Sequence, residues 1–219
     1  MSWLISAIEV RQWKASSSGW RRIWRVQPWP LRQPDEDAFH WRTSIAEISQ
    51  DTLFSLYPGY RRIQVLLHGQ GLQLGFADGR RNVLEPPWSH LGFGGDEVVA
   101  CHLVDGPVQV FNAMWDPARI DARLLHRPVV GPLVFLHEAG VEWFVHLLAG
   151  QLQLRGDATD VRLAQGDSLR LRAAPSQRLV LDGGGEILLL RLAQPDTAAG
   201  LAFAPDDQPG DDNAPLPEA

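Results

Sequence analysis

The sequence predicts an all-β protein made of two similar halves, and three observations support this. Glycine (20 residues) and proline (16 residues) are abundant, as expected where turns join many short strands. Polar and apolar residues alternate over residues 41–46 with the period of a strand. Residues 147–154 repeat the pattern of residues 66–74, one residue shorter at the turn. A repeated strand–turn–strand unit favours two antiparallel barrels or sandwiches in one chain.

The expected strands follow one another along the chain, separated by turn signals. We expect them over residues 2–10, 21–26, 41–46, 63–67, 72–76, 82–85, 97–104, 108–115, 168–171, 178–181 and 186–192. Pro58-Gly59 marks a turn, because proline fixes φ and glycine supplies a positive φ. Asp78-Gly79 predicts a two-residue hairpin. A short helix is expected only over residues 116–126.

The acidic charge is concentrated near the C-terminus. The formal net charge is -6, from 26 acidic and 20 basic residues. Six of the acids follow Arg191, the last basic residue, which leaves 20 acids to match 20 Lys and Arg in the preceding chain. We expect residues 193–219 to form a disordered acidic tail. The balanced remainder gives no indication of nucleic-acid binding.

Several features favour a cytoplasmic protein that does not bind membranes. The lone Cys101 excludes an intrachain disulfide and fits a reducing compartment. Residues 1–10 lack the basic region and apolar core of a signal peptide. No run reaches the roughly 20 apolar residues that a membrane helix needs. A homodimer formed by pairing of edge strands of two chains stays an open alternative.

One predicted strand carries two polar side chains on the same face. Arg42 and Ser44 alternate with Trp41, Thr43 and Ile45, so the bulky face and the polar face lie on opposite sides. A guanidinium and a hydroxyl side by side are an unusual pair to direct at a core. This strand is therefore the starting point for a candidate binding site.

Other residues are expected to join this pair inside one barrel. Arg61 or Arg62 follows the Pro-Gly turn, and Asn112 lies on a later strand among apolar residues. Arginine binds carboxylates in a bidentate way, and asparagine can fix their orientation. These residue types predict a pocket for a small carboxylate.

Three further residues complete the candidate set, and one alternative stays open. Glu47 and His102 are candidates for the rim of the pocket, and Asp96 lies in a Gly-Asp turn that could contact a ligand. In the alternative, Arg42 pairs with Glu47 or Asp96 and only ties strands together. The pocket and the structural ion pair are both compatible with the sequence.

The sequence predicts no metal site, cofactor or catalytic residue. No His-x-His motif occurs, whereas alternate strand positions are needed to direct two histidines at one metal. His137 and His146 are nine residues apart. No Gly-x-Ser-x-Gly motif occurs, and Cys101 lies in an apolar run where a buried, inert thiol is expected.

Five short motifs occur in one order along the chain. They are Trp41-Arg42-Thr43-Ser44-Ile45-Ala46, Phe54-Ser55-x-x-Pro58-Gly59-x-x-Arg62, Leu67-x-Gly69-x-Gly71-Leu72-x-Leu74, Phe93-x-Gly95-Asp96 and Leu103-x-Asp105-Gly106-Pro107-x-x-x-x-Asn112-x-Met114. Together they resemble the HutD/Ves family, up to about residue 192. The resemblance implies a bicupin, with two cupin-type β-barrels in one compact unit and a small-molecule pocket but no established enzymatic activity. It also implies a link to histidine utilisation, with formylglutamate as a suggested ligand, or to a stress response.

These observations lead to one expected organisation and three functional hypotheses. We expect an N-terminal barrel over residues 1–115, a C-terminal barrel over residues 116–192 and the tail over residues 193–219. The favoured function is binding of a small carboxylate in a metal-free pocket, with a regulatory or stress-related role. The alternatives are a metal-independent isomerase or lyase acting on a small acid or sugar, and an interaction module that uses the Trp-rich N-terminal region and the tail.

Overall fold

A computed structural model of the chain describes residues 9–11, 20–26, 39–156, 159–172, 175 and 177–195. Sixteen strands make up the regular structure of these residues. No helix in the described part is both long enough and apolar enough to cross a bilayer. Except for its first three residues, the segment predicted as an acidic tail lies outside the described residues.

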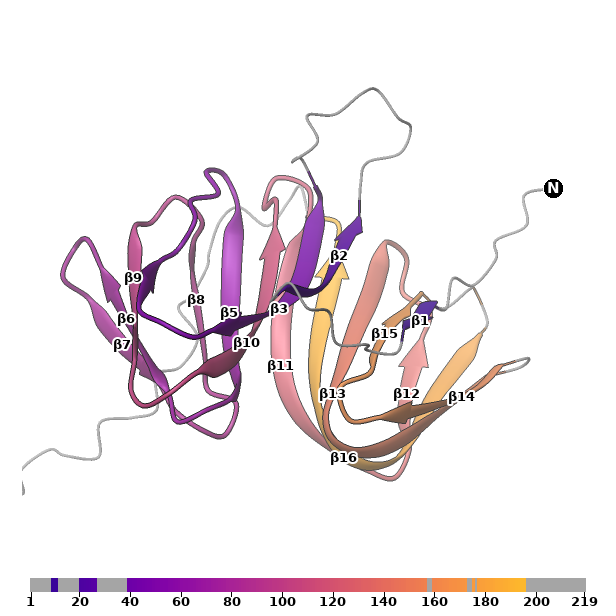
Figure 1. The fold of residues 1–219 in the computed structure, drawn as a ribbon. Coiled ribbons are helices and arrows are strands. Elements are labelled where there is room, and N and C mark those ends of the chain that lie inside the picture. Colours follow the sequence, from indigo (N-terminus) through magenta and orange to yellow (C-terminus); the bar gives the residue numbers. More distant parts are fainter. Residues whose placement is uncertain are drawn as a thin grey trace, which may run out of the picture.

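The strands form three antiparallel sheets, which Figure 1 shows side by side. The five-stranded sheet has the order β2 (Trp20–Val26), β3 (Trp41–Ile48), β10 (Val108–Trp115), β5 (Arg61–His68) and β8 (His90–Gly94). The four-stranded sheet has the order β4 (Thr52–Leu53), β9 (Val99–Leu103), β6 (Leu72–Phe76) and β7 (Arg81–Leu84). The seven-stranded sheet runs β1 (Glu9–Arg11), β15 (Ser168–Leu171), β13 (Val141–Gly156), β16 (Arg178–Ala193) and β11 (Asp121–Val130), with β12 (Leu133–Leu136) on β16 and β14 (Thr159–Ala164) on β13.

The five-stranded and four-stranded sheets share an apolar core, and we call this pair of sheets the N-terminal cup. Its buried residues are Leu66, Leu72, Leu74, Phe76, Leu84, Phe93, Val99, Cys101, Val108 and Val110. The seven-stranded sheet encloses a second core, and we call it the C-terminal cup. That core consists of thirteen buried apolar residues, among them Leu147, Leu169 and Leu189.

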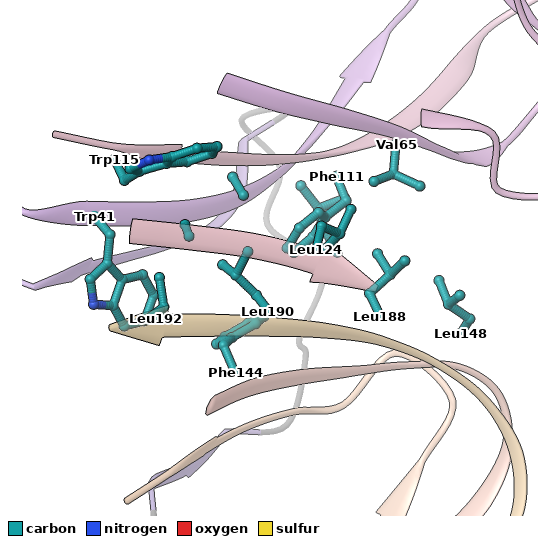
Figure 2. Close-up of a cluster of buried hydrophobic side chains, with 13 residues drawn as sticks. Trp41, Val65, Phe111, Trp115, Leu124, Phe144, Leu148, Leu188, Leu190 and Leu192 are labelled. Carbon is teal, nitrogen blue, oxygen red and sulfur yellow. The ribbon is translucent and has the colours of Figure 1, made fainter. Parts of the chain in front are cut away.

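A third core joins the two cups, as Figure 2 shows. Trp41 and Phe111, on the outer face of the five-stranded sheet, pack against Phe144 of β13 with ring centres 6.0 Å apart in each pair. Leu188 and Leu190 of β16 belong to the same cluster. The alternation along β3 therefore separates two environments. Trp41 faces the C-terminal cup, and the next residue, Arg42, faces the interior of the N-terminal cup.

The predicted all-β antiparallel fold is confirmed. Within the described residues, the strand pairings close none of the three sheets, so two closed barrels stay a prediction. The predicted boundary between the halves is crossed by one pairing, because β1 adds to the edge of the seven-stranded sheet through β15. Residues 20–26 and 39–115 otherwise supply the strands of the N-terminal cup.

The helix expected over residues 116–126 is a wrong prediction, because β11 begins at Asp121. A hydrogen-bonded turn, with the amide of Ile120 donating to the carbonyl of Asp116, leads into the strand. Burial then has a period of two: Ala122 and Leu124 are buried, and their neighbours are exposed. Pairing with β16 imposes this period, since long-range pairing and burial override weak local preferences.

Candidate functional site

Two arginines lie on the inner face of the N-terminal cup, in one row across three strands. Met114 of β10 is paired with Arg42 of β3 on one side and with Arg62 of β5 on the other. Residues directly opposite each other in antiparallel strands point to the same face, so we call this row the arginine layer. Arg42 is 8% exposed and Arg62 is 7% exposed. The fold therefore buries two cations in neighbouring positions.

Arg42 is held by aromatic rings and weak acceptors. Its Nη2 donates to the hydroxyl of Tyr57 at 3.3 Å and to the sulfur of Met114 at 3.5 Å. The guanidinium carbon lies 5.2 Å from the ring centre of Phe39 and 5.1 Å from that of Tyr57. Such distances allow cation–π attraction, which stabilises a desolvated cation without neutralising it.

Arg62 has a similar environment. Its Nη1 donates to the carbonyl of Ser55 at 3.1 Å, and its guanidinium carbon lies 5.0 to 5.8 Å from the ring centres of Phe54, Tyr57 and Phe93. Burial lowers the pKa of Arg62 to about 10; Tyr57 opposes this shift, and the charge of Arg42 adds to it. Arg62 thus stays protonated at neutral pH.

Neither arginine forms an ion pair with a carboxylate of the described residues, and the Nε atoms of both are buried without a hydrogen-bond partner. The alternative pairing of Arg42 with Glu47 or Asp96 is not formed. Buried charges are normally paired, as with Glu142 in the C-terminal half, whose carboxylate binds Arg170 at 2.7 Å. Among the described residues, the positive charge of the arginine layer is therefore an exception to this rule, which makes the layer a candidate anion site.

The next row along the same face consists of polar side chains. Asn112 of β10 is paired with Ser44 of β3 and Gln64 of β5, and we call this row the amide layer. The Oδ1 of Asn112 and the Oε1 of Gln64 are buried and have no hydrogen-bond partner in the described part of the chain. Below it, Val110 and Leu66 belong to the apolar core. The inner wall of the cup thus changes from charged to polar to apolar along the strands.

A loop over residues 54–60 covers the arginine layer. The amide of Tyr57 donates to the carbonyl of Gly95 at 2.6 Å, and the amide of Gly95 donates to the carbonyl of Tyr60 at 2.7 Å. The amide of Phe39 donates to the hydroxyl of Tyr60 at 3.2 Å. The loop backbone is therefore fixed to the turn after β8, while the side chain of Tyr57 reaches over both guanidinium groups.

Of the eight residues predicted for the site, the structure brings four together on the inner face of the cup. These are Arg42, Ser44, Arg62 and Asn112.

The other four predicted residues lie elsewhere. Arg61 and Glu47 are exposed, and each alternates with inward-facing neighbours on its strand. His102 lies on the outer face of the four-stranded sheet, with its Nδ1 2.9 Å from the carboxylate of Asp51. Asp96 is exposed in the turn after β8.

Sequence reasoning missed Gln64 and the aromatic cover formed by Phe39, Phe54, Tyr57 and Phe93. The signal for Gln64 was available, because it lies two residues after Arg62 on the same strand and so shares its face. No comparable signal exists for the aromatic side chains, which come from three separate segments of the chain.

One surface hollow lies away from Arg42 and Arg62. It has a volume of about 480 Å³, and Arg80, Arg81 and His102 are among the residues that line it. Arg80 is already paired with Asp78 and Glu97, and His102 with Asp51. We place the candidate site at the arginine layer instead, because uncompensated charge is a stronger indication of a ligand than an open surface hollow.

The thiol of Cys101 is enclosed in the core of the N-terminal cup. Burial raises the pKa of the Cys101 thiol to about 11. No group of three or more His, Cys, Asp or Glu side chains in the described part is arranged to hold a metal ion.

The comparisons with known proteins agree with this fold. A cupin 2 conserved barrel domain protein from Leptotrichia buccalis has a TM-score of 0.51 and 11% identity, over 83% of this chain and 92% of that chain. The fold is therefore cupin-like, and the site is a charged patch on the inner wall of one cup.

The sequence model of the HutD family matches residues 6–189, and this chain belongs to that family. An uncharacterised 21.2 kDa protein in the hutC 3' region of Pseudomonas putida is 33% identical over 141 residues, which are 61% of this chain and 73% of that protein. HutD from Pseudomonas fluorescens SBW25 is 25% identical with a TM-score of 0.64, over 87% of this chain and all of that one. The family predicted from the five motifs is confirmed.

Proposed function

We propose that this HutD-family protein binds a small carboxylate metabolite at the arginine layer, without the help of a metal ion, and has a regulatory or stress-related role. In this proposal the two cups are the two barrels of a bicupin, and the protein acts in the cytoplasm. The observation that carries the proposal is the pair of buried guanidinium groups, Arg42 and Arg62, without a carboxylate partner among the described residues.

An anionic ligand accounts for the energetics of this arrangement. Two like charges in a medium of low dielectric constant repel each other and have lost their hydration. A carboxylate offers two acceptor oxygens in the plane that a guanidinium recognises, and such charge-assisted hydrogen bonds are the stronger kind. The Nε atoms of Arg42 and Arg62, which lack partners, provide donors for it.

The names of two relatives motivate a candidate ligand. One relative is described by its position in the hutC 3' region, and one structural neighbour is named HutD. We therefore propose a metabolite of histidine utilisation, of the formylglutamate kind. The isomerase or lyase alternative relied on Glu47 and His102, which lie outside the cup, so no observation favours it.

Ligand-induced stabilisation tests the proposal. Wild-type protein is titrated with formylglutamate, glutarate and formate while the melting temperature and the heat of binding are measured. A ligand at 100 times its dissociation constant should stabilise the protein by about 2.7 kcal/mol. Arg42→Met and Arg62→Met should lose this response, whereas Arg61→Met, on the same strand as Arg62 but exposed, should keep it. Equal responses from all four proteins, or no binding of any carboxylate, would overturn the proposal.

A further inference from the structure

The amide layer contains acceptor atoms that a bare carboxylate cannot satisfy. The buried Oε1 of Gln64 and Oδ1 of Asn112 have no hydrogen-bond partner among the residues that the structure describes. Gln64 is 1% exposed, so bulk water does not reach it. Each carbonyl oxygen left in this state costs free energy, and buried groups of this kind call for an explanation.

The two layers differ in the kind of atom that lacks a hydrogen-bond partner among the described residues. In the arginine layer the unpartnered atoms, the Nε of Arg42 and of Arg62, are donors; in the amide layer they are acceptors. The layers are two residues apart along β3, β5 and β10, which is about 7 Å along each strand, and they share one face. A ligand lying along the strands would need to be about 7 Å long to reach both layers.

From this arrangement we infer that the ligand carries a hydrogen-bond donor, a hydroxyl or an amide N–H, in addition to its carboxylate, and that Gln64 and Asn112 select for that donor. This inference rests on the proposed function and narrows its class of ligands. The carboxylate faces the arginine layer, and the donor faces the amide layer. A second carboxylate in the amide layer is disfavoured, because its oxygens would face the carbonyl oxygens of Gln64 and Asn112.

Buried apolar side chains bound the candidate site on the side of the amide layer that is farther from the arginines. Leu66 is 1% exposed and Val110 is 1% exposed, and both lie in the closed core of the cup. The side chains that follow the amide layer therefore offer no further polar partner, so the donor lies at the inner end of the ligand.

Matched pairs of ligands test the selection without changing the protein. Isothermal titration compares 6-hydroxyhexanoate with hexanoate, which lacks the hydroxyl, and the mono-N-methylamide of glutaric acid with its mono-N,N-dimethylamide, whose amide carries a methyl group in place of the hydrogen. The donor-bearing member of each pair should bind about tenfold more tightly, as expected when buried acceptors gain a partner. Equal affinities within both pairs would overturn the inference and leave carboxylate binding intact.

Substitutions then assign the selection to the amide layer. Gln64→Met and Asn112→Leu keep the approximate shape but remove the acceptors, so the preference within each pair should fall toward one. Gln73→Met, on the four-stranded sheet, is the control and should keep the preference. A preference that survives both substitutions would overturn the assignment. Failure of every carboxylate to bind the wild type would overturn the proposed function as well as this inference.

Discussion

The guanidinium groups of Arg42 and Arg62 lie against the same aromatic ring, 5.1 and 5.8 Å from the ring centre of Tyr57. They come from strands separated by β10, and one row of the sheet places them together. The ring faces supply attraction to both cations but no negative charge. Within the described residues, aromatic rings thus offset the positive charge of the two guanidinium groups only in part.

Substitution of Arg62 should separate stability from function. Arg62→Met removes an unpaired buried charge and retains most of the apolar contact area of the side chain. We expect the free energy of unfolding without ligand to rise by about 1 kcal/mol, because replacing buried ions by apolar groups is often stabilising. Urea unfolding measures this change.

The matched control for this experiment is Arg61→Met, which changes an exposed neighbour and should alter stability by about 0.5 kcal/mol or less. A loss of stability in Arg62→Met, with Arg61→Met neutral, would mean that Arg62 mainly holds the loop over residues 54–60 in place.

The side chain of Tyr57 should control ligand exchange. Its ring covers both guanidinium groups, and its hydroxyl accepts one long hydrogen bond from Arg42. Tyr57→Phe keeps the ring, so we expect a dissociation rate within about threefold of the wild type, since one long hydrogen bond contributes little net free energy. Tyr57→Ala removes the cover and should speed dissociation by about tenfold or more, in line with the usual cost of removing a buried aromatic contact. Stopped-flow measurements give both rates, and equal rates for the two variants would contradict this role.

Gly95 should be essential for the position of the loop. A Cβ atom there would overlap the carbonyl oxygen of Tyr57 and lie 3.0 Å from that of Tyr60, and backbone atoms cannot move aside easily. We expect Gly95→Ala to lower the free energy of unfolding by roughly 2–4 kcal/mol and to abolish carboxylate binding. Gly92→Ala, three residues earlier, is the control, because its nearest neighbour is a flexible side-chain atom of Ile63 at 3.7 Å. Similar losses of unfolding free energy in both variants would show that any added methyl group near the end of β8 destabilises the protein, and that the contact of Gly95 with the loop is not the cause.

The two faces of β3 could be predicted from sequence, because alternation is a local property of a strand. Arg42 and Ser44 separate from Trp41 as expected, and the structure adds what each face meets. The choice between Arg61 and Arg62 could not be made in the same way. The register with β10 fixes which of them faces inward, and that register is a long-range pairing.

Similar reasoning explains why other predictions of the site could not succeed. The sequence identifies a strand around His102, but not that this strand joins the four-stranded sheet with that side chain on the outer face. The sequence predicts a helix over residues 116–126, but residues 121–126 belong to β11, which pairs with β16 far along the chain. Local patterns thus define strands and faces, whereas the partners of each strand decide which residues converge.

The burial of His146 should make the protein less stable in acid. Its ring stacks on Phe111 with ring centres 5.7 Å apart at the junction of the cups, and its Nδ1 lies 2.9 Å from the hydroxyl of Ser168. Burial lowers the pKa of His146 from 6.5 to about 4, and nearby His68 adds to the shift. The stability tied to neutral His146 is therefore complete above pH 6.5 and is lost as the pH falls toward 4, because the unfolded chain takes up a proton that the folded chain does not.

A non-titrating substitution isolates this effect from that of other groups. Between pH 7.5 and pH 4.5 the contribution of His146 should amount to roughly 2–3 kcal/mol. His146→Gln should be less stable than the wild type at pH 7.5, because the packing at the junction is disturbed, yet it should lose about that much less stability on acidification. Urea unfolding at the two pH values measures the difference, and parallel losses in the wild type and His146→Gln would show that acid acts on the protein through other groups.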